Sequence, residues 1–197
     1  MKQELERMKK ALVVVDAIKA FRTEGNMAIT DIGEEVDDEI VRLVQLFLER
    51  KDDVIFLMEG HTKDSVEFND FLVHGILGTT EAEAIDKLKP YLDKVIVIRK
   101  NSTSGFVTEK YQNYIKENMR KLGEIVYSGY CADICVPNVA IPTKMYFNEH
   151  NVNCDVIVPE NAIETFDAPG HSREEYNNIA KTVLRLNGIK VPYRYER

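Results

Sequence analysis

The chain has 197 residues, of which 44% are hydrophobic and 30% charged, an ordinary composition for a single domain spanning residues 1–197. Its formal net charge of -7 argues against nucleic acid and anionic membrane surfaces as partners. No apolar run approaches the roughly 20 residues that span a bilayer.

The N-terminus and the cysteines indicate the compartment. Residues 1–10, MKQELERMKK, predict a charged helical extension and lack the apolar segment of a secretory signal. The three cysteines, Cys131, Cys135 and Cys154, are odd in number and lack the spacing of a disulfide framework. We therefore expect a cytoplasmic location.

Five short segments rich in Val and Ile predict β-strands. Each is almost continuously apolar, which is typical of a strand covered on both faces in a parallel sheet. These segments are residues 11–15, 54–58, 95–98, 125–128 and 154–158. A further short strand is expected near residues 188–191.

Amphipathic stretches between these strands predict helices. In residues 31–50, apolar side chains recur on one helical stripe. The other expected helices are residues 80–88, 106–122, 134–148 and 172–186. Pro142 should kink its helix or end it early. The alternation of strands and helices predicts a three-layer α/β/α fold with a mostly parallel central sheet.

Polar side chains stand at the ends of four successive predicted strands. Asp16 follows the first, Glu59 and His61 follow the second, Lys100 follows the third, and the loop to Cys135 follows the fourth. Because α/β sheets bind ligands at the carboxyl ends of their strands, we expect these groups to share one rim.

The residues at this rim suit nucleophilic catalysis. Cys135 is expected in the first turn of a helix, where the helix dipole and Lys100 would both favour the thiolate. Asp16 would take the thiol proton and later return it to a leaving amine. Each residue also has an ordinary reading: Cys135 as a buried small hydrophobe, Asp16 as a cap, and Lys100 as a solvated cation. Cys131 and Cys135 lack the CxxC spacing of a redox pair.

Four motifs resemble those of the isochorismatase-like hydrolases, which include nicotinamidases, isochorismatases and N-carbamoyl amide hydrolases. They are ALVVVDAIKAF, HGILGTTEAEAIDKL, KNSTSGF and GYCADICV, in chain order. The resemblance implies the Rossmann-like three-layer fold and a catalytic triad of Asp16, Lys100 and Cys135. It also implies a homo-oligomer, because dimers and larger assemblies are common in this superfamily.

The same resemblance implies further site residues. The backbone amides of Cys131 and Cys135 would form the oxyanion hole, with a cis peptide bond between Tyr130 and Cys131. Phe21 and Phe71 match aromatic positions that sandwich a planar ring in nicotinamidases. Without the resemblance, both rings are equally well explained by core packing.

A metal site is also implied, with departures from the usual ligands. His61 and His74 match directly, whereas Glu59 replaces an aspartate and Glu67 stands where histidine is common. Such donors suit Zn²⁺, Mn²⁺ or Fe²⁺, although the extra methylene of Glu59 would misplace its carboxylate. The alternative is that both histidines are hydrogen-bonded pocket residues. No organic cofactor is expected, and His150 and His171 are expected in surface or capping roles.

The expected activity is hydrolysis of a C–N amide bond of a small molecule through a cysteine thioester. Nicotinamide is the leading substrate, and an isochorismatase or N-carbamoyl amide hydrolase is the alternative. A non-catalytic metabolite- or metal-binding protein is the other alternative, favoured by the altered metal ligands and by Ala132 in place of a common threonine. Gly75 and Thr103 also depart from the family pattern.

Overall fold

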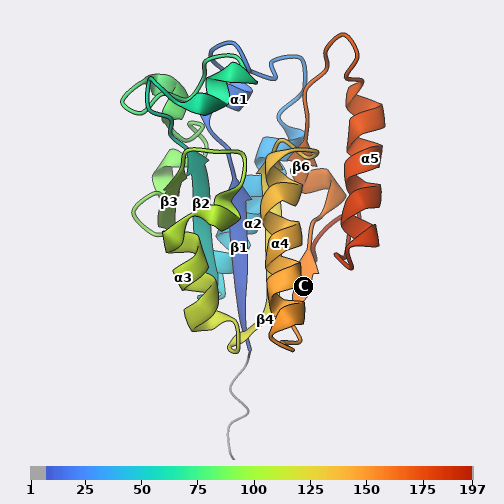
Figure 1. Cartoon of the computed structure of the whole chain (residues 1–197). Coiled ribbons are helices and arrows are strands. Elements are labelled where there is room, and N and C mark those ends of the chain that lie inside the picture. The colour runs from blue at the N-terminus through green and yellow to red at the C-terminus, as the bar shows by residue number, and fades with distance from the viewer. Residues whose placement is uncertain (1–7, 197) are drawn as a thin grey trace, which may run out of the picture.

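A parallel sheet forms the centre of the computed structural model, which describes residues 8–196 (Figure 1). The strand order is β3-β2-β1-β4-β5, and β6 pairs with the end of β4. All the pairings are parallel. The strands are β1 (Lys9–Val15), β2 (Asp53–Glu59), β3 (Ile96–Lys100), β4 (Leu122–Tyr130), β5 (Asp155–Ile157) and β6 (Ile163–Glu164).

The central strand β1 explains why the sheet is covered on both faces. Val13 and Val15 point into one apolar core, while Leu12 and Val14 point into a second core on the opposite face. All four side chains are buried, and each stabilises the fold by about 1.5–3 kcal/mol. The continuously apolar strand pattern and the three-layer expectation are thereby confirmed.

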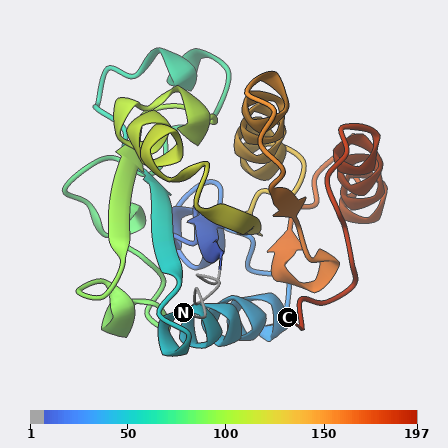
Figure 2. The same cartoon turned by 90° about the horizontal axis from the view of Figure 1, so that it is seen from below.

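Helices cover the two faces unequally (Figure 2). Helix α2 (Glu35–Glu49) packs its apolar stripe on one face, and α3, α4 and α5 lie on the other. The remaining helices are α1 (Lys19–Arg22), α3 (Glu109–Asn118), α4 (Cys135–Glu149), α5 (Arg173–Leu186) and the 3-10 turns η1 (Val66–Asn69), η2 (Thr80–Ala82), η3 (Lys89–Tyr91), η4 (Gly105–Val107) and η5 (Glu160–Ala162). None of the helices described for residues 8–196 combines the length and apolar character needed to cross a bilayer.

The N-terminal extension differs from its expected form at Lys9 and Lys10. Both belong to β1, because their backbones continue the pairing with β4. Residues 1–7 of that extension lie outside the described residues.

The helix expected over residues 80–88 was wrong. Only η2 is helical there, and the chain then runs beside the segment that follows β1. Lys19 N donates to Glu83 O, and Ile85 N donates to Ala17 O. These tertiary hydrogen bonds use backbone groups that a continuous helix would need for itself.

Two other helix predictions need correction. The stretch 106–122 splits into η4, α3 capped by Thr108, and the start of β4. Pro142 does not end α4, which continues to Glu149. Proline lacks the N–H that would bond Asn138 O, and the Ser104 hydroxyl donates to that carbonyl instead at 2.8 Å.

The strand expected near residues 188–191 is reduced to one bridge between Lys190 and Ile157. Sequence patterns also missed the two-residue strand β6, which is too short to show an apolar pattern.

Gly129 permits the close approach of β4 to β1 beside the site. Its φ is +115°, and a Cβ there would lie 1.9 Å from Val15 O. We expect Gly129→Ala to lower the free energy of unfolding by about 2–3 kcal/mol, measured by urea denaturation. Gly78→Ala is the control, since Gly78 has φ +86° but open space at the Cβ position, and should cost about 1 kcal/mol. Equal losses in the two variants would show that the contact with Val15 is unimportant.

Candidate active site

The ends of three neighbouring strands and the start of one helix build the site. Glu59 and Lys100 are the last residues of β2 and β3 and lie opposite each other in the sheet register. Asp16 directly follows β1, and Cys135 is the first residue of α4. Residues distant in sequence therefore meet because parallel strands end at the same edge.

Lys100 is buried in the middle of this group. Its Nζ lies 2.8 Å from Asp16 Oδ2, 2.6 Å from Glu59 Oε1 and 3.9 Å from Cys135 Sγ, and it donates to Ser102 O at 2.8 Å. Burial alone would lower the pKa of Lys100, but the surrounding acidic groups, Asp16 first, raise it above its usual range. The amine is therefore a fixed positive charge beside the thiol.

Asp16 is a buried carboxyl group with a near-neutral pKa. Burial raises this pKa to about 7 against the lowering effect of the Lys100 ammonium. Asp16 Oδ1 accepts a hydrogen bond from Glu59 N at 2.8 Å, which fixes the carboxyl orientation. A carboxyl with this pKa can both accept and donate a proton near neutral pH.

The Cys135 thiol lies within reach of both acids. One oxygen each of Asp16 and Glu59 and the Sγ atom lie within 4.8 Å of one another. Burial raises the pKa of this thiol well above its usual range, and Lys100 lowers it only in part. The expectation that Lys100 favours the thiolate is right in direction, but burial outweighs it, so the resting group is the thiol.

In the turn before Cys135, some backbone N–H groups have a hydrogen-bond acceptor and others have none. The peptide bond between Tyr130 and Cys131 is cis, as expected. The N–H groups of Ala132, Ile134 and Val136 donate to backbone carbonyls. Within the described part of the chain, those of Cys131, Asp133 and Cys135 have no such acceptor. Of these, the N–H groups of Cys131 and Cys135 are the pair that the resemblance implied as donors to an oxygen atom bound beside Sγ.

A small cavity opens onto this thiol. Phe21 and Phe71 both line it, as the resemblance implied, with Phe21 buried and Phe71 half-buried. The walls also include Met27, Ile134 and Thr103, so they are largely apolar. Met27 and Ile134 were missed from the sequence, because no local pattern distinguishes a pocket-lining apolar residue from a core residue.

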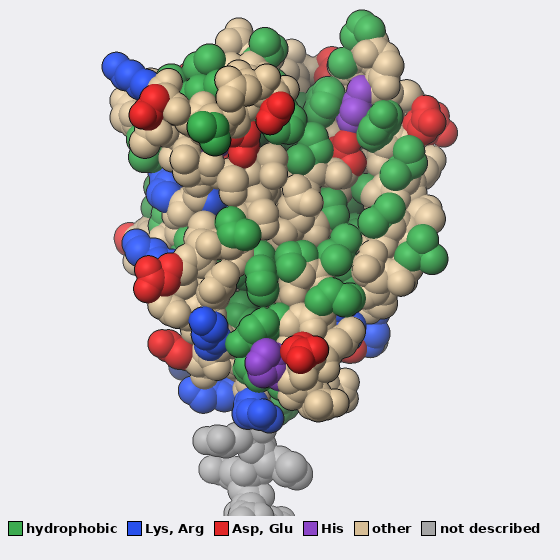
Figure 3. Space-filling view, in the orientation of Figure 1, with side chains coloured by type: hydrophobic (Ala, Val, Ile, Leu, Met, Phe, Trp, Pro, Cys, Tyr) green, Lys and Arg blue, Asp and Glu red, His purple; other side chains and the backbone are tan. Residues whose placement is uncertain are grey.

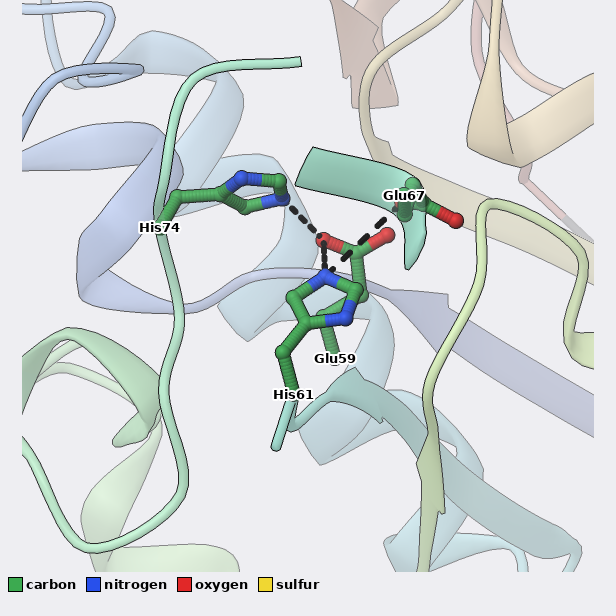
Figure 4. A group of neighbouring side chains, drawn as sticks. All are labelled: Glu59, His61, Glu67 and His74. Atoms are coloured by element: carbon green, nitrogen blue, oxygen red, sulfur yellow. Dashed lines mark hydrogen bonds and ion pairs between the residues drawn. The ribbon is translucent and has the colours of Figure 1, made fainter. Parts of the chain in front are cut away.

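Two histidines and two glutamates form one cluster at the edge of the same cavity (Figure 4). Four ligand atoms, one from each of Glu59, His61, Glu67 and His74, lie within 4.8 Å of one another. Glu59 Oε2 lies 2.9 Å from His74 Nε2 and 3.5 Å from His61 Nε2. The structure thus brings together all four residues of the expected metal set.

Hydrogen bonds occupy the Nδ1 atoms of the two imidazoles, and both Nε2 atoms face the Glu59 carboxylate. His74 Nδ1 donates to Leu72 O at 2.6 Å, and His61 Nδ1 donates to Asn101 Oδ1 at 3.0 Å. With a proton on Nδ1 alone, each ring would direct an Nε2 lone pair at the Glu59 carboxylate. A proton or a divalent cation there removes this repulsion. Burial lowers the pKa of both histidines, but their hydrogen bonds and the negative charge of Glu59 together raise it above its ordinary value.

Unsatisfied atoms also fit a cation. Among the described residues, His61 Nε2 and Glu67 Oε1 are buried without a hydrogen-bond partner, and they face each other at 3.8 Å. Nitrogen and carboxylate donors at this spacing suit Zn²⁺, Mn²⁺ or Fe²⁺. The longer Glu59 side chain still brings its carboxylate to two partners. One of its oxygens reaches Lys100 while the other reaches His74.

Comparison with known families agrees with this geometry. The family model described as Isochorismatase domain matches residues 10–186. The chain belongs to the isochorismatase family. A curated member from Bacillus subtilis (strain 168), described as an uncharacterized isochorismatase family protein PncA, is 27% identical over 175 residues, covering 84% of this chain and 91% of its own.

Solved structures share the isochorismatase-like α/β fold. The nicotinamidase PncA from Bacillus subtilis is 27% identical with a TM-score of 0.77, covering 94% of this chain and 99% of its own. The N-carbamoylsarcosine amidase from Thermoplasma acidophilum is 25% identical with a TM-score of 0.75, covering 96% and 99%. The pyrazinamidase of Pyrococcus horikoshii, solved in complex with zinc, shares the fold at 18% identity, with a TM-score of 0.76 and coverage of 95% and 99%. The family and its amidase members support an amidohydrolase.

The histidine–glutamate cluster predicts metal affinity. We expect His61→Ala and His74→Ala each to weaken Zn²⁺ or Mn²⁺ binding at least about tenfold, because each removes an Nε2 ligand. Isothermal titration calorimetry on metal-free protein measures the affinity. His150→Ala, at the exposed end of α4, should bind like the wild type. Unchanged affinity in both test variants would place the metal elsewhere.

Proposed function

We propose that this isochorismatase-family protein hydrolyses the C–N bond of a small amide through a thioester on Cys135. The observation that carries the proposal is the buried contact of Lys100 with Asp16 and with the Cys135 thiol. In this arrangement a proton acceptor and a fixed cation lie beside a nucleophile that lines the cavity. These are the parts that acyl transfer to a cysteine requires.

The reaction begins with proton transfer from the thiol to the Asp16 carboxylate. Sγ then forms a bond to the amide carbonyl carbon, and the oxygen gains negative charge. The N–H groups of Cys131 and Cys135 donate to that oxygen. The C–N bond breaks as Asp16 returns its proton to the leaving nitrogen, which releases ammonia or an amine and leaves a thioester.

Water completes the cycle. Asp16 takes a proton from the water molecule, whose oxygen attacks the thioester carbon. The C–S bond breaks, the acid product leaves, and the proton on Asp16 returns to Sγ. Lys100 stabilises the thiolate whenever it forms, so its positive charge acts in both halves of the cycle.

Nicotinamide is the leading substrate. The two phenylalanine rings and the largely apolar walls of the cavity suit a planar aromatic amide. A nicotinamidase is also among the similar structures that cover nearly the whole chain.

The metal ligands would be His61, His74, Glu59 and Glu67. A bound Zn²⁺, Mn²⁺ or Fe²⁺ would supply positive charge and Lewis acidity beside the cavity. The side chains of Asp16, Lys100 and Cys135 perform the steps described above, and no step is assigned to the metal ion.

Removing the thiol is the direct test. Cys135→Ala should reduce the kcat of nicotinamide deamidation by about 10⁴-fold or more, because the covalent pathway is lost. Ammonia release measures the rate. Cys154→Ala is the matched control: Cys154 is also buried and free but does not line the cavity, so kcat should stay within about twofold.

Two outcomes would contradict the proposal. Hydrolysis of isochorismate, a vinyl-ether reaction that does not need the thiol, would survive in Cys135→Ala and identify an isochorismatase. A wild-type protein that binds amides but hydrolyses neither nicotinamide nor N-carbamoyl compounds would be a non-catalytic binding protein. A panel of amides and isochorismate, with and without added Zn²⁺ or Mn²⁺, distinguishes these cases.

The aromatic wall predicts a selective effect on binding. Phe71→Ala should raise the KM for nicotinamide about tenfold and leave kcat within about threefold, because Phe71 contacts the ring and not the reacting carbonyl. Steady-state kinetics separates the two constants. Tyr193→Ala, which removes an exposed ring outside this cavity, should change neither. A fall in kcat with constant KM would instead place Phe71 at the reacting group.

A further inference from the structure

We propose that His171 is a positioning residue that holds the oxyanion-binding turn through Asp133, an inference that rests on the proposed function. Asp133 lies in the turn between Cys131 and Cys135, and its side chain points away from the thiol cavity toward other partners. His171 Nε2 donates to Asp133 Oδ2 at 2.7 Å. This histidine was expected in a surface or capping role, yet its side chain is only 14% exposed.

Three hydrogen bonds join the turn to the segment around β6. Besides the contact from His171, Thr165 Oγ1 donates to Asp133 Oδ1 at 2.5 Å. Ala132 N donates to Glu164 O at 2.9 Å. Both carboxylate oxygens of Asp133 are therefore held, and so is the backbone one residue before it. The orientation of the turn is thus determined from outside the catalytic cavity.

Two ring contacts and two hydrogen bonds hold the His171 ring. It stacks against Phe166 with ring centroids 3.9 Å apart and against Tyr176 at 3.7 Å. Its Nδ1 donates to Phe166 O at 3.1 Å, so both ring nitrogens face acceptors. These contacts fix both the plane of the ring and its rotation within that plane.

The position of this network predicts a specific chemical effect. The free N–H groups of Cys131 and Cys135 flank Asp133 on either side, so a small rotation of the turn redirects both. Stabilisation of an oxyanion depends on the direction of such donors. The environment of Sγ depends instead on Lys100, Asp16 and Glu59, none of which contacts His171 in the described structure.

Two probes that react with the same thiol separate these effects. Iodoacetamide alkylates Sγ at a tetrahedral carbon with loss of iodide, so no oxyanion forms. With p-nitrophenyl acetate, Sγ bonds to the carbonyl carbon through an oxyanion, and p-nitrophenolate leaves as a coloured product. The ratio of acylation to alkylation at Cys135, with mass spectrometry to locate the label, measures oxyanion stabilisation separately from thiol reactivity.

His171→Phe retains a flat ring for stacking and removes both N–H donors. We expect its acylation rate to fall about tenfold to hundredfold, with alkylation within about twofold of the wild type. His171→Gln, whose amide can donate to Asp133, should recover most of the acylation rate. His150→Phe is the matched control, because His150 also donates from Nδ1 to a backbone carbonyl and stacks on Tyr146, but at the far end of α4.

The remaining outcomes are decisive. If His171→Phe does not fold, Thr165→Val serves as the second test, because it removes the other side-chain hydrogen bond to Asp133. It should also lower the acylation-to-alkylation ratio. A ratio unchanged in folded His171→Phe, or equal losses in both reactions, overturns the positioning role. If the wild-type protein is acylated but hydrolyses no amide, the proposed function is refuted. The acylation-to-alkylation ratio then still tests the role of His171. Wild-type protein that is alkylated but never acylated refutes both.

Discussion

The buried ammonium group of Lys100 is the constraint on which the site depends. Removing an ion from water costs several kcal/mol, and Lys100 is compensated by Asp16, Glu59 and a backbone carbonyl, all within 2.8 Å. The two carboxylates come from β2 and the residue after β1, so the register of adjacent strands sets the geometry. A one-residue slip would turn these side chains to the opposite face.

Glu59 links the proposed triad to the histidine pair. One of its oxygens contacts Lys100 and the other contacts His74, so the same carboxylate belongs to both groups. One lysine faces two acids here, which leaves excess negative charge toward the histidines. That charge favours a proton or a metal ion at the Nε2 atoms, and either cation would in turn reduce the effect of Glu59 on the thiol.

Sequence patterns predicted the parts of this protein that depend on local periodicity and on strand ends. The buried part of β1, residues 11–15, is continuously apolar, and the polar residues at the carboxyl ends of β1, β2 and β3 mark the rim. Prediction failed where tertiary contacts replaced local hydrogen bonds. Residues 80–88 bond to the segment after β1, and α4 passes Pro142 because Ser104 supplies the missing donor. His171 was missed because its partner Asp133 is 38 residues away.

The sequence alone determined the α/β class and the strand-end positions of Asp16, Lys100 and Cys135, because these follow from hydrophobic patterning. The candidate metal ligands were implied by the resemblance of the chain's motifs to the isochorismatase-like hydrolases. Only the tertiary structure decided how these groups act on one another. Burial, which no local pattern reports, raises the pKa of Asp16 to about 7 and keeps Cys135 a thiol. Packing across the sheet likewise decided that Glu59 reaches both Lys100 and His74, and that Asp133 meets His171.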